Sequence, residues 1–151
     1  STRKGHAMKI YLDNCCFNRP FDDQSHLRIR LEVEAKLRIQ EEVRAGRFEL
    51  VWSYLLDYEN DRNPFRERRE QIAKWRRYAT EDIQADPELL DHAEALGILG
   101  IRNLDALHLA CAWRAGADCF LTTDDGILKK AHHFNGLRIL NPIDFILREL
   151  P

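Results

Sequence analysis

Short apolar runs alternate along the chain with longer segments whose apolar residues recur at helical spacing. The clearest helical stripe runs from Leu27 to Ile39, and Gly46 supplies a stop for it. The compact apolar runs predict four strands, at residues 9–12, 48–52, 119–123 and 137–140. The periodic segments predict helices at residues 26–45, 54–61, 65–79, 87–96, 103–114 and 141–150, with a short helix after Asp124. Residues 14–24 are expected to form a loop.

This order of elements favours a single α/β domain. Strands separated by helices imply a mostly parallel sheet that helices cover on both faces. Right-handed crossovers then bring the ends of the first and third predicted strands, at Asp13 and Asp124, to one side of the molecule. Residues 1–7 precede Met8 and are typical of a remnant added for expression, so the predicted domain spans residues 8–151.

Composition indicates a soluble globular chain. Hydrophobic residues make up 44% and charged residues 32% of the sequence, which excludes the profile of a disordered protein. No apolar run approaches the roughly 20 residues needed to cross a membrane, and no signal-peptide pattern is present. The four cysteines form no CxxC pair. We therefore expect a cytoplasmic protein with reduced, packed thiols.

Acidic side chains follow the predicted strands or open the predicted helices. Asp13 ends the first strand, Glu59 lies on the helix after the second, and Asp105 lies in the first turn of a later helix. Asp124 and Asp125 follow the third strand. Ligands of parallel α/β sheets bind beyond the carboxyl ends of the strands, so these acids are candidates for one shared site.

Each acid taken alone has an equally good structural explanation. Asp13 can cap a turn, and an aspartate in a first helical turn is stabilised by the helix dipole. Asp57 and Asp61 lie close to Glu59 in the sequence and compete with it for the same role. Spacing alone therefore leaves the shared site open.

A cluster of carboxylates would need a cation, because the negative charges otherwise repel one another and raise their pKa values. Oxygen ligands without histidine or cysteine at suitable spacing favour Mg²⁺ or Mn²⁺ over Zn²⁺. Such an ion holds a phosphate and lowers the pKa of a bound water, which suits phosphodiester cleavage. His108 lies one turn after Asp105, although a lone helix histidine is more often structural.

Four short blocks occur in a characteristic order: IYLDN, SYLLDYE, LDALHLACA and FLTTDD. Together they resemble the PIN-domain nucleases, which include the toxin halves of VapBC-type toxin–antitoxin pairs, over nearly everything from Met8 onward. The resemblance implies catalytic roles for Asp13, Glu59, Asp105 and Asp124. It implies that the three aspartates hold the main metal ion and that Thr122 pairs with Asp124.

The resemblance also implies a three-layer α/β/α fold, Mg²⁺ or Mn²⁺ dependence and cleavage of RNA. Family members often form homodimers, and the toxins are commonly silenced by an antitoxin protein. The chain departs from the common pattern at Asn14, where many members carry threonine or serine. Asn14 can still hydrogen-bond a ligand carboxylate or a phosphate, and Asp125 is a candidate for a further ligand or a supporting acid.

Positive charge is concentrated in one segment. Residues 62–77 carry seven Lys and Arg against two Glu. Within this segment Arg66 and Arg69 are candidates for phosphate contacts, which would give the protein affinity for RNA. Arg19 is a separate candidate for a phosphate contact. The plainer explanation of the segment is a solvated helix face with Trp75 in the core.

The leading hypothesis is a metal-dependent endoribonuclease, with a possible toxin role. The alternative is a binding module on the same fold, whose acid pocket no longer cuts and serves RNA or a protein partner. A magnesium-dependent phosphatase or a phospho-receiver is disfavoured. A receiver needs a lysine at the end of a later strand, and LRILNP supplies none.

Overall fold

Five strands form one parallel sheet in a computed structural model that describes residues 7–131 and 134–150. The strands are β1 (Met8–Leu12), β2 (Phe48–Ser53), β3 (Ala79–Ile83), β4 (Cys119–Leu121) and β5 (Arg138–Leu140). Their order in the sheet is β3-β2-β1-β4-β5, and every neighbouring pair is parallel. The predicted α/β fold with a parallel sheet is therefore confirmed.

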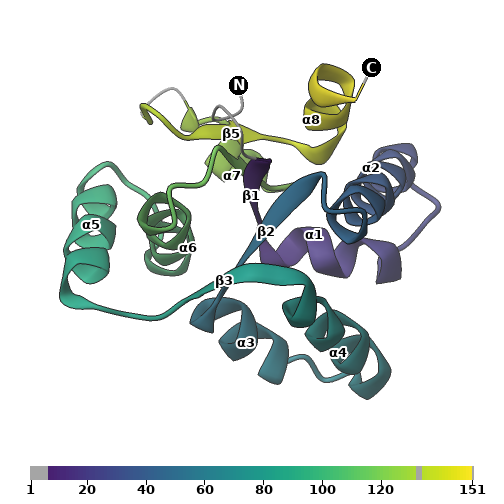
Figure 1. The fold of residues 1–151 in the computed structure, drawn as a ribbon, viewed down its shortest axis with the longest axis horizontal. Coiled ribbons are helices and arrows are strands. Elements are labelled where there is room, and N and C mark those ends of the chain that lie inside the picture. Colours follow the sequence, from purple (N-terminus) through teal and green to yellow (C-terminus); the bar gives the residue numbers. More distant parts are fainter. Residues whose placement is uncertain (1–6, 132–133, 151) are drawn as a thin grey trace.

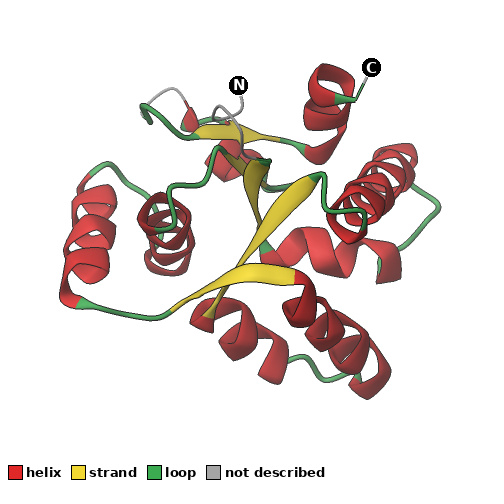
Figure 2. Cartoon of the chain, viewed as in Figure 1, coloured by secondary structure: helices red, strands yellow, loops and turns green. Residues whose placement is uncertain are grey.

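Helices cover both faces of this sheet. They are α1 (Asn14–Asn18), α2 (Leu27–Arg44), α3 (Tyr54–Asp61), α4 (Arg66–Ala73), α5 (Pro87–Ile98), α6 (Asn103–Arg114), α7 (Asp125–Leu128) and α8 (Pro142–Glu149). Two short 3-10 helices, η1 (Arg19–Phe21) and η2 (Lys74–Tyr78), connect α1 to α2 and α4 to β3. Helices α5 and α6 lie on one side of the sheet and α1 and α2 on the other (Figure 1). The predicted three layers are visible as strands between two groups of helices (Figure 2).

The central strands are apolar because both faces of a parallel sheet are buried. All five residues of β1 are buried, and β2 is buried at every position except Glu49. The edge strand β3 differs, because its sequence ATEDI alternates between half-buried and exposed positions. The prediction of four strands was wrong, because the polar sequence of β3 lacks the apolar run by which the other strands were identified.

Two other segments differ from their predicted form. The loop expected at residues 14–24 contains α1 and η1, which are too short to show helical periodicity. The helix expected at residues 65–79 ends at Ala73 and continues as a 3-10 helix, so it is interrupted.

The helix boundaries mostly follow the predicted signals. The Ser53 side chain accepts a hydrogen bond from the backbone N–H of Leu56 and caps α3, as expected. Gly46 and Gly116 follow α2 and α6 with φ values of +78° and +66°, a conformation that glycine adopts without strain. The cap of α6 is Arg102, because Asn103 is the first helical residue.

No helix in the described ranges is long and apolar enough to cross a membrane. All four cysteines are free, and three of them are buried, as expected. Six of the seven residues interpreted as an expression remnant lie outside the described part of the chain.

Lys36 is an unusual member of the packed interior between α2 and η2. Lys36 is only 4% exposed. Its Nζ lies 5.6 Å from the ring centroid of Phe17 and 5.9 Å from that of Trp75. No hydrogen bond or ion pair joins Lys36 to another described residue. Burial lowers the pKa of Lys36 to about 8, against the opposing effect of Cys16 and with a smaller contribution from the positive charge of Arg44.

Lys36→Met is expected to stabilise the protein at pH 7. A pKa lowered from 10.5 to about 8 corresponds to about 3 kcal/mol of unfavourable free energy. Losing the cation–π contacts would offset about 1 kcal/mol, which leaves a net gain of about 2 kcal/mol. Between pH 8 and pH 10.5 the unfolded chain holds a proton that the folded chain has released, so the wild type gains stability as pH rises.

The advantage of the variant should therefore shrink between pH 7 and pH 9.5. Urea unfolding of both proteins at the two pH values measures it. Arg148→Met, which removes a charge from the exposed side of α8, is the control and should change little. An advantage that is absent at pH 7, or that is unchanged at pH 9.5, would contradict the stated cause.

Candidate active site

Asp13 lies at the carboxyl end of β1 in the middle of the sheet. Asp13 is 7% exposed. Its backbone N–H donates to the Leu121 carbonyl at 2.9 Å and so continues the pairing of β1 with β4. Oδ1 accepts the backbone N–H of Asn14 at 2.8 Å, and Oδ2 accepts the Thr122 hydroxyl at 2.8 Å. Cys15 Sγ lies 3.5 Å from the same Oδ2. Asp13 is therefore both the cap of α1 and a carboxylate in a fixed orientation.

Thr122 connects Asp13 to Asp124. Its Oγ1 accepts the backbone N–H of Asp124 at 3.1 Å while the hydroxyl donates to Asp13. Asp124 caps α7, because its Oδ1 accepts the backbone N–H groups of Gly126 and Ile127 at 2.7 and 3.2 Å. A Cβ at Gly126 would lie 3.0 Å from that oxygen, so this tight turn favours glycine. Within the described residues Oδ2 of Asp124 has no hydrogen bond, which leaves it available to a ligand.

Asp105 faces both of these acids from α6. It is half-buried in the first helical turn. Burial raises the pKa of Asp105, and the negative charges of Asp13 and Asp124 raise it further. The three aspartates that the sequence proposed as ligands therefore interact with one another electrostatically.

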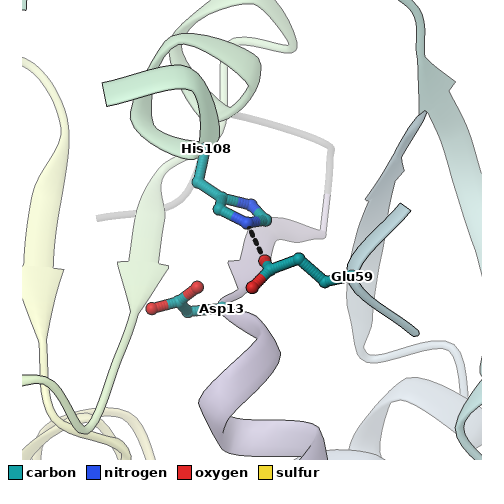
Figure 3. Close-up of side chains that lie close together, drawn as sticks. All are labelled: Asp13, Glu59 and His108. Carbon is teal, nitrogen blue, oxygen red and sulfur yellow. Dashed lines mark hydrogen bonds and ion pairs between the residues drawn. The ribbon is translucent and has the colours of Figure 1, made fainter. Parts of the chain in front are cut away.

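Glu59 reaches Asp13 from the opposite side, and His108 lies between their elements. Glu59 Oε1 and His108 Nε2 form a hydrogen bond, and the Asp13 carboxylate lies beside the pair (Figure 3). One oxygen or nitrogen atom from each of the side chains of Asp13, Glu59 and His108 lies within 4.8 Å of the other two. The rival acid Asp57 is occupied elsewhere, because its Oδ1 accepts the Trp52 indole N–H at 3.0 Å.

A buried network holds His108 in place. The Tyr11 hydroxyl lies 2.6 Å from His108 Nδ1 and 2.7 Å from Ser53 Oγ. Burial lowers the pKa of His108, but the hydrogen bond to Glu59 and the charges of Asp13, Glu59 and Asp105 outweigh it, so the pKa is raised overall. The surrounding carboxylates therefore favour the protonated imidazole, whose positive charge would reduce their mutual repulsion.

His108 is the residue that the sequence undervalued. Its position one turn after Asp105 placed it near the site, but its burial and its contact with Glu59 depend on tertiary packing. Tyr11 could not be found from the sequence either, because an alternating strand position is equally compatible with a purely apolar contact. The hydrogen bond between Tyr11 and His108 forms only when β1 and α6 pack together.

These residues fit a divalent metal ion. Carboxylate oxygens from Asp13 and Glu59 are close enough to share one ion, and carboxylate oxygens suit Mg²⁺ and Mn²⁺. Both ring nitrogens of His108 already have partners, Glu59 and Tyr11, so His108 orients Glu59. Asn14 Oδ1 next to Asp13 is buried and has no hydrogen-bond partner among the described residues, so it offers one more acceptor for a ligand or water. The proposed ligands were Asp13, Asp105 and Asp124, whereas the close group consists of Asp13, Glu59 and His108.

A cavity of about 420 Å³ opens beside Asp105 and Asp124. Three cations line it with these acids, namely Arg102, Lys129 and Lys130. Lys130 Nζ donates to the Gly100 carbonyl at 2.5 Å, whereas Arg102 and Lys129 are exposed and form no ion pair with described residues. These cations were not predicted to meet, because Arg102 lies far from Lys129 and Lys130 in the sequence.

Arg19 and Asp125 both lie in ion pairs. Arg19 donates to Glu32 at 2.8 Å and to Asp22 at 3.0 Å. Both oxygens of Asp125 accept hydrogen bonds from Arg28 at 2.9 Å, and this contact lowers the pKa of Asp125. Arg28 also contacts Glu32, so one buried carboxylate anchors the cations on both sides. Arg19 is therefore less available to a phosphate than its place in the sequence indicated.

The basic segment is also partly paired. Arg66 forms an ion pair with Glu70 at 3.0 Å, and Arg69 donates to the Asn63 carbonyl at 2.8 Å. Trp75 is buried at 9% exposure, as the plainer explanation expected. These contacts stabilise α4 and η2 locally and leave any role of Arg66 and Arg69 in RNA binding as a prediction.

Comparison with known proteins agrees with this geometry. A search of curated proteins found no match. Among solved structures, a chain of VapBC2 from Rickettsia felis, bound in that crystal to a DNA fragment from their promoter, has the same fold. The TM-score is 0.56 at 14% sequence identity, and the match covers 89% of this chain and 98% of that chain. The family model described as the PIN domain matches residues 10–133, which is most of the sequence. The chain therefore belongs to the PIN domain family.

Proposed function

We propose that this PIN domain is a metal-dependent endoribonuclease that hydrolyses RNA phosphodiester bonds. The observation that carries the proposal is the position of Asp13. This carboxylate meets Glu59 and His108 on one side, and its charge acts on Asp105 together with that of Asp124 on the other. Acids collected at the carboxyl end of a parallel sheet form a site suited to a divalent ion and a phosphate.

Asp13, Asp105 and Asp124 would hold the ion, with Glu59 completing the site from α3. When bound, Mg²⁺ or Mn²⁺ supplies a water of lowered pKa and positive charge beside the scissile phosphate. The protein side chains hold the carboxylates in position. Thr122 fixes the orientation of Asp13, and His108 fixes that of Glu59.

The cavity beside Asp105 gives the substrate a place to bind. Arg102 and Lys129 present unpaired positive charge at its edge, and these are the groups that contact phosphates in nucleic-acid complexes. We therefore assign the nearest phosphate contacts to these two residues, while Arg66 and Arg69 remain candidates for contacts farther along the RNA.

A toxin role extends the proposal. The matched protein VapBC2 was crystallised with DNA from their promoter, and its name denotes a pair of proteins. By analogy, we propose an antitoxin protein as a partner and a homodimer as the assembled form. These partners concern regulation, so the proposed chemistry does not depend on them.

Cleavage of a mixed, structured RNA pool tests the function. Purified protein is expected to cut RNA with Mg²⁺ or Mn²⁺ and to stop when EDTA is added. Asp105→Asn should remove most of the activity, because it takes away one proposed ligand while preserving the size of the side chain. Cutting that persists in EDTA would contradict the proposal. Absence of both cutting and metal binding would favour the silent binding module.

A further inference from the structure

A second cavity lies away from the acids, between α2 and the α4–η2 segment. Its volume is about 360 Å³, within the usual range for a small-ligand site. Phe17 and Phe21 line one part of it, and Ile72 and Trp75 line another. The third wall is α2. None of the metal-binding residues proposed above lines this cavity.

The wall formed by α2 carries a row of hydrogen-bond donors. Lys36, Gln40 and Arg44 are four residues apart and therefore lie on one face of the helix. Lys36 and Gln40 are each 4% exposed, and Gln40 Nε2 is buried without a hydrogen-bond partner. No described carboxylate forms an ion pair with Lys36 or Arg44.

Such donors are costly to the folded protein. A buried donor without an acceptor loses its hydrogen bonds to water and gains none in return. Folded proteins rarely leave such a group unpaired. Gln40 Nε2 has no hydrogen-bond partner among the described residues, and the neighbouring Lys36 Nζ contacts aromatic rings there, which indicates that the acceptor comes from a ligand. The ligand must therefore bring negative charge or several acceptor atoms to Lys36, Gln40 and Arg44.

The opposite walls are aromatic. Trp75 lies against the guanidinium of Arg44, whose carbon is 4.8 Å from the ring centroid. Phe21 is 39% exposed at the rim, so a flat ring entering the cavity would meet an aromatic surface there. Phosphate contacts from cations combined with stacking on aromatic side chains are the usual means of holding single-stranded nucleic acid.

We propose that this cavity binds a nucleotide of single-stranded RNA, with its phosphate near Lys36 and Arg44 and its base against Phe21, the exposed aromatic ring at the rim. The inference rests on the proposed function for its choice of RNA. The one carboxylate in the lining, Glu67, is exposed on α4 and leaves the buried donors uncompensated.

The cavity is also placed to act with the acid site. Phe17 belongs to α1, the helix that Asp13 caps, so this wall begins about one helical turn from the central acid. A cavity that holds one base and its phosphate would favour single-stranded substrates, because the bases of a duplex are already paired.

Titrations of the full chain in EDTA test the site without cleavage. The probes are uridine monophosphate, a short oligouridine and inorganic phosphate, and tryptophan fluorescence reports binding. Wild type should bind oligouridine more tightly than the mononucleotide, and phosphate alone most weakly. Lys36→Met should weaken the binding of both nucleotide probes by about tenfold or more, as expected for the loss of one charged hydrogen bond. Trp75→Phe should remove most of the fluorescence change, because the Trp75 indole lines the cavity and contacts Arg44, which the phosphate would approach.

Two controls keep the result interpretable. Arg148→Met removes one positive charge far from the cavity and should bind like wild type. Thermal unfolding should show that Lys36→Met is folded and at least as stable as wild type. Gln40→Leu, which removes the other buried donor, should also weaken binding. Equal affinities for wild type and Lys36→Met, or phosphate binding as tightly as the mononucleotide, would overturn the proposal.

The same measurements separate this site from the acid site. Nucleotide binding that depends on Lys36 in a protein that never cuts RNA would refute the nuclease and retain the cavity. Metal-dependent cutting by a protein whose nucleotide binding ignores Lys36 would refute the cavity and retain the nuclease.

Discussion

Asp13→Asn is expected to leave a folded protein that has lost metal-dependent RNA cleavage. Asparagine keeps the oxygen that accepts the Asn14 N–H, so the cap of α1 survives. It removes the negative charge that the cluster needs for a metal ion. Loss of a residue that merely supports a metal ligand already costs about 10–100-fold, so loss of a central ligand should cost at least about 100-fold in cleavage rate.

Initial rates of RNA cleavage in saturating Mn²⁺, with circular dichroism to verify folding, measure this effect. Asp144→Asn on α8 makes the same chemical change on an exposed helix and should retain full activity. A folded Asp13→Asn protein that cuts RNA at the wild-type rate would show that Asp13 is only a helix cap.

Glu32→Ala should produce the largest loss of stability. Glu32 is fully buried and accepts hydrogen bonds from Arg19 at 2.8 Å, Arg28 at 3.1 Å and Asn141 at 2.5 Å. Alanine leaves these donors without their acceptor. Removing one partner of a buried ion pair costs 3–5 kcal/mol, and the partial exposure of the two arginines reduces the expected loss to about 2–4 kcal/mol.

The same substitution should disturb the acid site from a distance. Arg28 donates to the Thr123 carbonyl and to both oxygens of Asp125, so it holds the segment that carries Asp124. Urea unfolding measures the stability, and Glu34→Ala, at an exposed position of the same helix, is the matched control. A loss of stability no larger than that of the control would show that Glu32 contributes little to the fold.

The sequence revealed the parts of the site that depend on local order. Asp13 follows an apolar strand, Asp105 opens a helix, and Asp124 both follows a strand and caps a helix. Parallel topology then brings strand ends together, so the gathering of these acids could be expected without coordinates. The choice of Glu59 over Asp57 came from the family resemblance, and the contact with His108 agrees with it.

The remaining parts depend on packing between distant segments. His108 becomes a partner of Glu59 only when α3 and α6 meet, and Tyr11 orients it only when β1 lies beneath α6. Arg19 was a candidate for a phosphate contact, and its ion pair with Glu32 on α2 could not be read from the sequence. β3 was missed because an edge strand with charged, exposed positions has no apolar pattern to read.

The central claim is that the carboxylates around Asp13 hold a divalent metal ion. Calorimetric titration of Mn²⁺ into the wild type and Asp13→Asn tests it directly, independently of the RNA substrate. We expect saturable binding to the wild type that is weakened at least about 100-fold or lost in the variant, because the shared ligand is gone. Equal Mn²⁺ affinity in the two proteins, or none in the wild type, would contradict the claim.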